Sequence, residues 1–191
     1  MPAKFEVAFD LTMGNEGGYL SVVRAAEVHD KGGETYRGIA RNYHPDWPGW
    51  VRIDAAKGNP GFPSSLAQDA ELQEMVQSFY LVVFWSYGQF NSQEIANRVF
   101  DMAVNMGPRT AHIYLQKALN YVSKAGLIAD GLLGIKTREA INAADETNLL
   151  NELKARHLAH YIKRALGDAS QVGFLVDTEG NPQGWLRRAV S

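Results

Sequence analysis

The 191-residue chain contains no cysteine. That absence excludes disulfide bonds, thiolate metal sites and cysteine nucleophiles, and it fits either a reducing compartment or export without redox help. The chain also lacks a strong excess of charge of either sign, because 19 basic residues face 21 acidic ones and the net charge is -2. We therefore expect no nucleic acid bound through a broad basic surface.

Long apolar runs are missing as well. The most apolar stretch, residues 79–85, is far shorter than the roughly 20 residues that a membrane-spanning helix needs. Glu6 and Asp10 interrupt the region where the apolar core of a signal peptide would lie. We therefore expect no stable membrane insertion, and a protein that first accumulates in the cytoplasm of its host cell.

Several catalytic motifs are absent from the sequence. None of the five histidines belongs to a His-Glu-x-x-His pattern, and no glycine loop ends in Gly-Lys-Ser/Thr. No Gly-x-Ser-x-Gly elbow occurs either. We accordingly expect no metal and no cofactor.

The main pattern in the sequence is the spacing of apolar residues at three- and four-residue steps, which is typical of helices. It predicts helices over residues 5–13, about 66–88, 92–107, 109–122, 137–144 and 148–166. Ser64 and Ser65 are the expected N-caps of the second of these. Three glycines between residues 32 and 38 indicate a turn-rich loop or irregular hairpin. The predicted fold is mainly α, with at most a small β-hairpin near residues 20–40.

Aromatic side chains outside these helices have two interpretations. Trp47 and Trp50 lie beside prolines, where a tryptophan more often closes the edge of a core than stacks on a sugar. Phe174 and Trp185, in the C-terminal tail, are expected to be buried against earlier helices.

The stretch Asn15-Glu16-Gly17-Gly18-Tyr19 follows the first predicted helix. A carboxylate near the negative end of a helix dipole, covered by apolar neighbours, tends to hold its proton. Glu16 is therefore a candidate proton donor, although a glutamate at such a position is more often an ordinary solvated residue. Asp30 and Thr35 follow in a polar, glycine-rich loop. Glycoside hydrolysis needs a proton donor and a second group that positions water or attacks.

These motifs resemble the Glu-Gly-Gly-Tyr, lysozyme-like enzymes of glycoside hydrolase family 108. The resemblance extends over residues 30–39 and through later segments to 184–188, nearly the whole chain. It implies an N-acetylmuramidase with a lysozyme-like helical fold that cuts the glycan strand of bacterial peptidoglycan. Glu16 would be its general acid. The order of Glu16, Asp30 and Thr35 is also similar to the triad of phage-type lysozymes, although there the intervening loop is shorter. By that analogy Asp30 and Thr35 would hold the attacking water, whereas Asp30 could instead brace the Gly32-Gly33 turn.

The resemblance also implies a division of the chain. Residues 1–96 would form the lysozyme-like catalytic region, and residues 97–191 a helical peptidoglycan-binding region packed against it. Asp101, Asn105 and Gln116 would contact glycan or peptide, or would instead satisfy a structural network. Tyr19 and Tyr36, inside the two N-terminal motifs, are further expected substrate contacts.

The expected activity is that of an endolysin-type muramidase, a bacteriolytic enzyme of phage lysis that reaches the wall after release from the cytoplasm. We expect it to act as a monomer. Two alternatives stay open. One is a wall-binding protein that keeps the fold without turnover, and the other is a wall amidase or peptidase.

Overall fold

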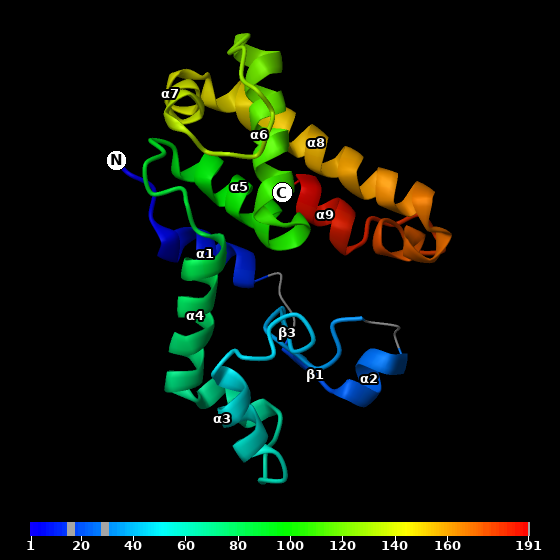
Figure 1. Ribbon diagram of the computed structural model, residues 1–191. Coiled ribbons are helices and arrows are strands. Elements are labelled where there is room, and N and C mark those ends of the chain that lie inside the picture. Colours follow the sequence, from blue (N-terminus) through cyan, green and yellow to red (C-terminus); the bar gives the residue numbers. More distant parts are fainter. Residues whose placement is uncertain (15–17, 28–30, 191) are drawn as a thin grey trace. The chain divides into compact units, whose positions relative to one another are not determined.

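The computed structural model describes residues 1–14, 18–27 and 31–190, with the backbone alone at residues 26, 27 and 170. Helices dominate these residues, and short strands form one small antiparallel sheet, so the predicted fold class is confirmed (Figure 1). The chain divides into two compact units. We call residues 9–85 the N-terminal unit, and residues 1–8 with 86–191 the C-terminal unit.

The sheet of the N-terminal unit consists of β1 (Tyr19–Leu20), β2 (Thr35–Tyr36) and β3 (Ile39–Ala40), in the order β1-β2-β3. Tyr36 pairs with Tyr19 on one side and with Ile39 on the other. The two residues between β2 and β3, Arg37 and Gly38, both have positive φ, at 48° and 79°. Positive φ at both central residues is what a type I′ turn requires, and this turn matches the twist of a tight hairpin.

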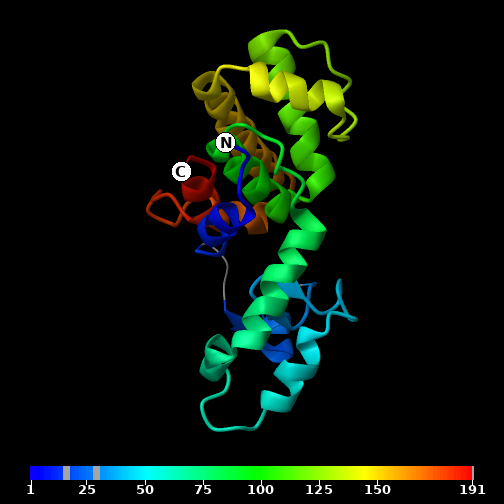
Figure 2. The same ribbon diagram turned by 90° about the vertical axis from the view of Figure 1, so that its left-hand side faces the viewer.

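Three α-helices belong to this unit. In the sequence α2 (Val22–Glu27) lies between β1 and β2, and α3 (Gly49–Ala56) and α4 (Ala70–Phe84) follow β3. Figure 2 shows α3 beside α4, which it contacts. The single long helix expected from residue 66 to 88 is wrong at both ends. Ser64–Gln68 forms the 3₁₀ helix η1, and Asp69 caps α4 by accepting a hydrogen bond from the Leu72 amide at 3.0 Å. An aspartate at this position satisfies an amide that the helix itself cannot.

Tryptophans lie in the core of the N-terminal unit. Trp47 and Trp50 are buried, and their rings meet edge to face with centroids 5.1 Å apart. The Trp50 indole N–H donates to the His44 carbonyl at 2.8 Å, which satisfies its only polar atom. Gly49 lies between them, and a Cβ there would come within 2.3 Å of the Trp47 ring. The packing interpretation of these tryptophans is confirmed.

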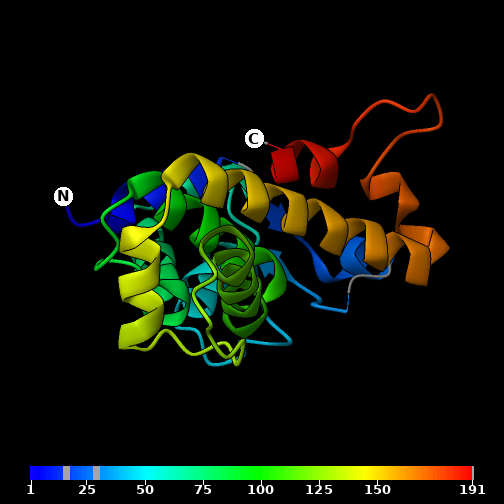
Figure 3. The same ribbon diagram turned by 90° about the horizontal axis from the view of Figure 1, so that it is seen from above.

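The C-terminal unit is a helical assembly. It contains α5 (Gln93–Met106), α6 (Pro108–Ser123), α7 (Ile135–Ala143), α8 (Glu146–Gly167) and α9 (Gly184–Val190). The long helix α8 contacts α5, α6 and α9, so these three helices pack around it (Figure 3). α1 (Phe5–Met13) begins in the same unit, where the Phe5 ring meets the edge of Phe100 with centroids 5.8 Å apart.

The tail after α8 is held by stacked aromatic rings. Trp185 stacks on Tyr161 at 4.8 Å and on Phe174 at 5.0 Å between centroids. Phe174 itself is 55% exposed, so the expectation that it would be buried is wrong, because it covers Trp185 rather than entering the core. Within the described ranges, no helix has both the length and the apolar character needed to cross a membrane.

Candidate active site

The candidate site of the N-terminal unit is built around β2, which carries Thr35. Backbone hydrogen bonds continue the hairpin beyond its strands: the Arg41 amide donates to the Glu34 carbonyl at 2.8 Å, and the Asn42 amide to Gly32 at 3.1 Å. Asn42 adds a side-chain bond from Nδ2 to the Lys31 carbonyl at 3.0 Å. The segment that leads into Thr35 is therefore fixed along its length although it is a loop.

Thr35 is half-buried, and its hydroxyl hydrogen is already committed. Oγ1 donates to the Gly33 carbonyl at 3.1 Å. A hydroxyl has one hydrogen and two lone pairs, so the oxygen retains only its acceptor capacity. A water next to Thr35 would therefore donate to Oγ1.

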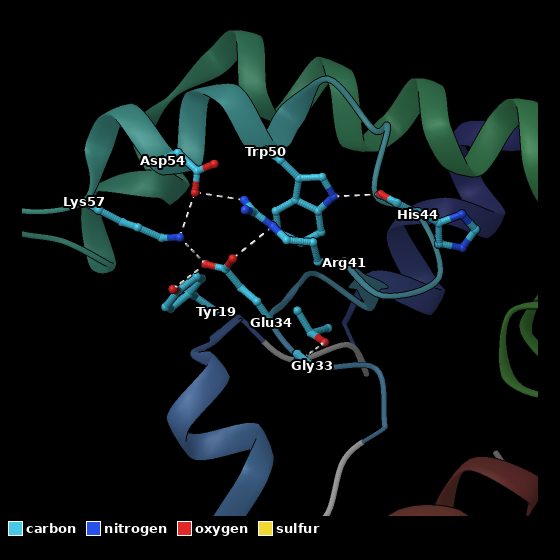
Figure 4. A network of polar contacts seen from close by, with 9 residues as sticks. Tyr19, Gly33, Glu34, Arg41, His44, Trp50, Asp54 and Lys57 are labelled. Atoms are coloured by element: carbon cyan, nitrogen blue, oxygen red, sulfur yellow. Dashed lines mark hydrogen bonds and ion pairs between the residues drawn. The ribbon is translucent and has the colours of Figure 1, made fainter.

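Glu34, the neighbour of Thr35, contacts Tyr19, Arg41 and Lys57 through its carboxylate (Figure 4). Its side chain is 2% exposed. Oε1 accepts a hydrogen bond from the Tyr19 hydroxyl at 2.6 Å and pairs with Lys57 Nζ at 2.7 Å, while Oε2 pairs with Arg41 Nε at 3.0 Å. Because a buried carboxylate needs such partners, these contacts explain how the charge is accommodated.

Asp54, on α3, binds the same two cations as Glu34. Its Oδ1 accepts from Arg41 Nη2 at 2.9 Å and from Lys57 Nζ at 2.7 Å. The hydrogen bonds from Arg41 and Lys57 hold the pKa of Asp54 below its usual value. Burial alone would lower the pKa of Lys57, but its hydrogen bonds to Asp54 and Glu34 outweigh that effect and raise it.

Tyr19 reaches this network from β1. Its ring packs edge-on against Phe62 with centroids 4.9 Å apart. Burial, together with the hydrogen bond to the Glu34 carboxylate, raises the pKa of Tyr19 to about 12. The hydroxyl therefore stays protonated near neutral pH and can donate to Glu34.

Tyr36 belongs to the core rather than to an open surface. It is 3% exposed, and its hydroxyl accepts a hydrogen bond from Gln73 Nε2 at 2.9 Å. Its predicted contact with substrate stays a prediction, and this environment favours a structural role.

The two predicted catalytic carboxylates, Glu16 and Asp30, lie outside the described residues. Their roles stay predictions. The described part of the site consists of Thr35 and the network that surrounds its strand.

The three polar residues expected to bind substrate in the C-terminal unit all take part in internal contacts. Asp101 pairs with Arg188 Nε at 2.8 Å and accepts from Asn105 Nδ2 through its backbone carbonyl at 3.2 Å. Gln116 is 1% exposed. It accepts from the Gly131 amide at 2.8 Å and donates to Asp130 and to the Leu132 carbonyl. These contacts favour the structural alternative for Asp101 and Gln116.

The network around Glu34 was not identified from the sequence. Glu34 lies in the polar, glycine-rich loop, and its two cations come from the residues directly after β3 and directly after α3, at sequence separations that no local pattern reveals. The one available signal was an acidic residue between two glycines and a strand, which is a common arrangement. As for metals, no cluster of three or more potential ligands occurs among the residues that the structure covers.

Comparison with known proteins gives three results. No curated protein matches the chain. Among solved structures, the chain is similar to "Structure of Brucella abortus SagA", with 23% sequence identity and a TM-score of 0.60, covering 97% of this chain and 89% of that one. This similarity shows that the two share a fold. The model of the family Glycosyl hydrolase 108 matches residues 9–107, more than half of the sequence and the whole segment that carries Glu16, Asp30 and Thr35. The chain therefore belongs to glycosyl hydrolase family 108.

Proposed function

We propose that this protein is a peptidoglycan hydrolase, an endolysin-type muramidase that cleaves the β-1,4 bond between N-acetylmuramic acid and N-acetylglucosamine. The observation that carries the proposal is the match to a glycoside hydrolase family across the segment that contains all three proposed catalytic residues. Membership of that family favours glycosidic cleavage over both rivals, the non-catalytic wall-binding protein and the amidase or peptidase.

In the proposed reaction Glu16 donates its proton to the leaving oxygen of the glycosidic bond. Asp30 accepts a proton from a water molecule as that water attacks the anomeric carbon from the opposite face. Thr35 supports this step, because its Oγ1 already donates to Gly33 and is left to accept the second hydrogen of the water. A water held through both hydrogens directs a lone pair at the sugar. Single displacement of this kind inverts the anomeric configuration.

The C-terminal unit would then bind the wall. It contains an open groove of about 890 Å³ formed by the end of α6, the loop that follows it and α7. Exposed Leu132 and Ile135 and the charged Asp130 and Lys136 line this groove. Apolar surface beside both signs of charge suits peptidoglycan, whose stem peptides carry methyl groups, carboxylates and an amine.

The location proposed for the activity follows from its substrate. The protein would accumulate in the cytoplasm of the host, act on the wall after release, and lyse the cell as a phage-type lysis enzyme does. Action as a monomer is part of the same proposal.

The decisive experiment digests purified sacculi and analyses the products by mass spectrometry. A muramidase leaves new reducing N-acetylmuramic ends, whereas an amidase or peptidase releases free peptides. Glu16→Gln should abolish glycan cleavage and leave the far-ultraviolet circular dichroism unchanged. Glu6→Gln, which removes an exposed acid from α1, is the matched control and should cleave like the wild type. Substantial activity of Glu16→Gln would reject Glu16 as the general acid, and binding without any cleavage by the wild type would reject the enzyme.

Wall binding is tested separately with the Glu16→Gln protein, so that the sacculi stay intact. Lys136→Ala in that background should lower the amount that sediments with sacculi, while Lys117→Ala, an exposed lysine on α6 outside the groove, should not. Equal sedimentation of both variants would exclude the groove.

A further inference from the structure

The position of Thr35 depends on a very small sheet. β1 and β2 contribute two residues each, and Leu20 is the residue opposite Thr35. Tyr19 pairs with Tyr36 in the same ladder and follows Glu16 by three residues in the sequence. The placement of β1 relative to β2 therefore affects both the Glu16 side and the Thr35 side of the proposed catalytic arrangement. A ladder this short supplies few hydrogen bonds to hold it.

Glu34 provides a second connection between these strands. It precedes Thr35 directly, and its carboxylate accepts the Tyr19 hydroxyl hydrogen at 2.6 Å. The bond is charge-assisted, so it is both shorter and stronger than one between neutral groups. Any shift of β1 along β2 would break it.

The same carboxylate is anchored to the packed part of the unit. Lys57 follows α3 directly, and Arg41 follows β3; both cations pair with Glu34. The Arg41 guanidinium in turn lies over the Trp50 ring at 4.4 Å, and Trp50 is buried in the core. Glu34 thus joins β1, β2, the segment after β3 and the end of α3 at one point (Figure 4).

Stability alone is a weak explanation for such a group. A buried ion pair seldom stabilises a fold more than apolar residues of the same size would, and in some proteins its role is to specify geometry. We propose that Glu34 is a positioning residue of the proposed glycosidase: its bond to Tyr19 and its pairs with Arg41 and Lys57 fix β1 against β2, so that the Thr35 hydroxyl is presented to the attacking water. This inference rests on the proposed function.

The test measures kcat and KM separately on a soluble, undecorated oligomer of the wall glycan. Tyr19→Phe removes one hydroxyl and keeps the ring against Phe62, so the fold should survive. We expect kcat to fall about tenfold or more, since small displacements of a positioned group have such effects, and KM to stay within about twofold. Tyr43→Phe, an exposed tyrosine of the same unit, is the control and should change neither constant.

A second pair of variants tests the anchor. Lys57→Met removes the ammonium that pairs with Glu34, and Lys57→Arg retains a cation. Lys57 is 39% exposed, so both substitutions should be tolerated by the fold. We expect Lys57→Met to lower kcat and Lys57→Arg to restore most of it. A purely structural residue would instead change the fraction of folded enzyme and leave kcat per folded molecule unaltered.

Each remaining outcome is decisive. If the wild type cleaves the oligomer and both Tyr19→Phe and Lys57→Met keep its kcat, the positioning role is wrong although the proposed function stands. If Tyr19→Phe raises KM and leaves kcat unchanged, Tyr19 contacts substrate directly and the inference is again wrong. If the wild type leaves every glycan bond intact, the proposed function itself fails.

Discussion

The Tyr87 hydroxyl donates a hydrogen bond to Nε2 of His112 across 3.0 Å, inside the C-terminal unit. The direction of this bond follows from the other ring nitrogen. Nδ1 lies 3.0 Å from the Gly131 carbonyl oxygen, which can only accept, so Nδ1 carries the hydrogen. Burial lowers the pKa of His112, and the neutral ring then has Nε2 free to accept. One side chain thus links the residues after α4 to the loop before α7.

Removing that hydroxyl should cost stability. Tyr87→Phe leaves a buried acceptor on His112 without its donor, and we expect a loss of about 1–3 kcal/mol in the free energy of unfolding, measured by urea denaturation. Tyr114→Phe is the matched control, because the Tyr114 hydroxyl also contacts a histidine, His160, at 3.2 Å but is only partly buried. Its cost should be smaller. Equal costs would contradict burial as the cause.

Gly33 should not tolerate a side chain. Its φ is +69°, and a Cβ there would lie 2.8 Å from the Asn42 amide nitrogen that holds the loop. We expect Gly33→Ala to lower stability by about 2–3 kcal/mol, because it combines backbone strain with a displaced hydrogen bond. Gly126→Ala separates the two effects, since Gly126 has a φ of +64° and open space around it. That control should lose only about 1 kcal/mol, and the same loss in both variants would exclude the contact with Asn42.

His157 should make stability depend on pH. It is fully buried in α8, its ring nitrogens have no hydrogen-bond partner among the described residues, and burial with the nearby charges of Arg98 and Arg188 lowers its pKa to about 3. The unfolded chain protonates near pH 6.5 while the folded chain does not, so stability is complete above that pH and decreases as the pH falls toward 3. At pH 5 the loss should be about 2 kcal/mol.

The matching variant is His157→Phe, which keeps a ring against Tyr161 and cannot be protonated. Urea denaturation at pH 7.5 and pH 5 should give the wild type a larger difference than the variant, by about that amount. A pH dependence that is the same in both proteins would show that other groups cause it.

The pair between Asp101 and Arg188 should behave as a structural interaction. Their side chains are only 13% and 12% exposed, so removing either charge takes an ion pair from a largely desolvated partner. We expect Arg188→Met to destabilise the protein by about 3 kcal/mol, and the double variant Asp101→Asn/Arg188→Met to recover part of that loss. A double-variant cycle with no coupling energy would contradict the interaction. Unchanged kcat/KM per folded molecule would separate it from a contact with substrate.

Local sequence patterns predicted a helix well where a capping residue marks its start and a glycine or proline marks its end. Ser92 caps α5 through the Ile95 amide, and Gly107 with a φ of 84° ends it just before Pro108. The start of α4 was misjudged because two serines and an aspartate compete as caps within six residues, and only packing selects Asp69. α2 was missed, since six residues of mixed character have too little periodicity to report a helix.

The candidate site was predictable where a motif names a residue type and not where chemistry depends on distant partners. The similarity to the triad of phage-type lysozymes singles out Thr35 together with Glu16 and Asp30, and its role stays a prediction. Glu34 could not be predicted, because its burial results from Lys57 and Arg41, which the fold brings together. Charge in a glycine-rich loop normally indicates solvent exposure, and here three-dimensional pairing overrides that expectation.

The loop before α7 has a consequence for amide hydrogen exchange. It has little regular backbone pairing, yet Gln116 accepts the Gly131 N–H at 2.8 Å and Asn120 accepts the Leu127 N–H at 2.7 Å. These two side chains stand four residues apart on α6 and replace the partner that a neighbouring strand would supply. The amides of Gly131 and Leu127 should therefore exchange with deuterium about as slowly as those of the helix that holds them, so that opening of the loop is coupled to opening of α6.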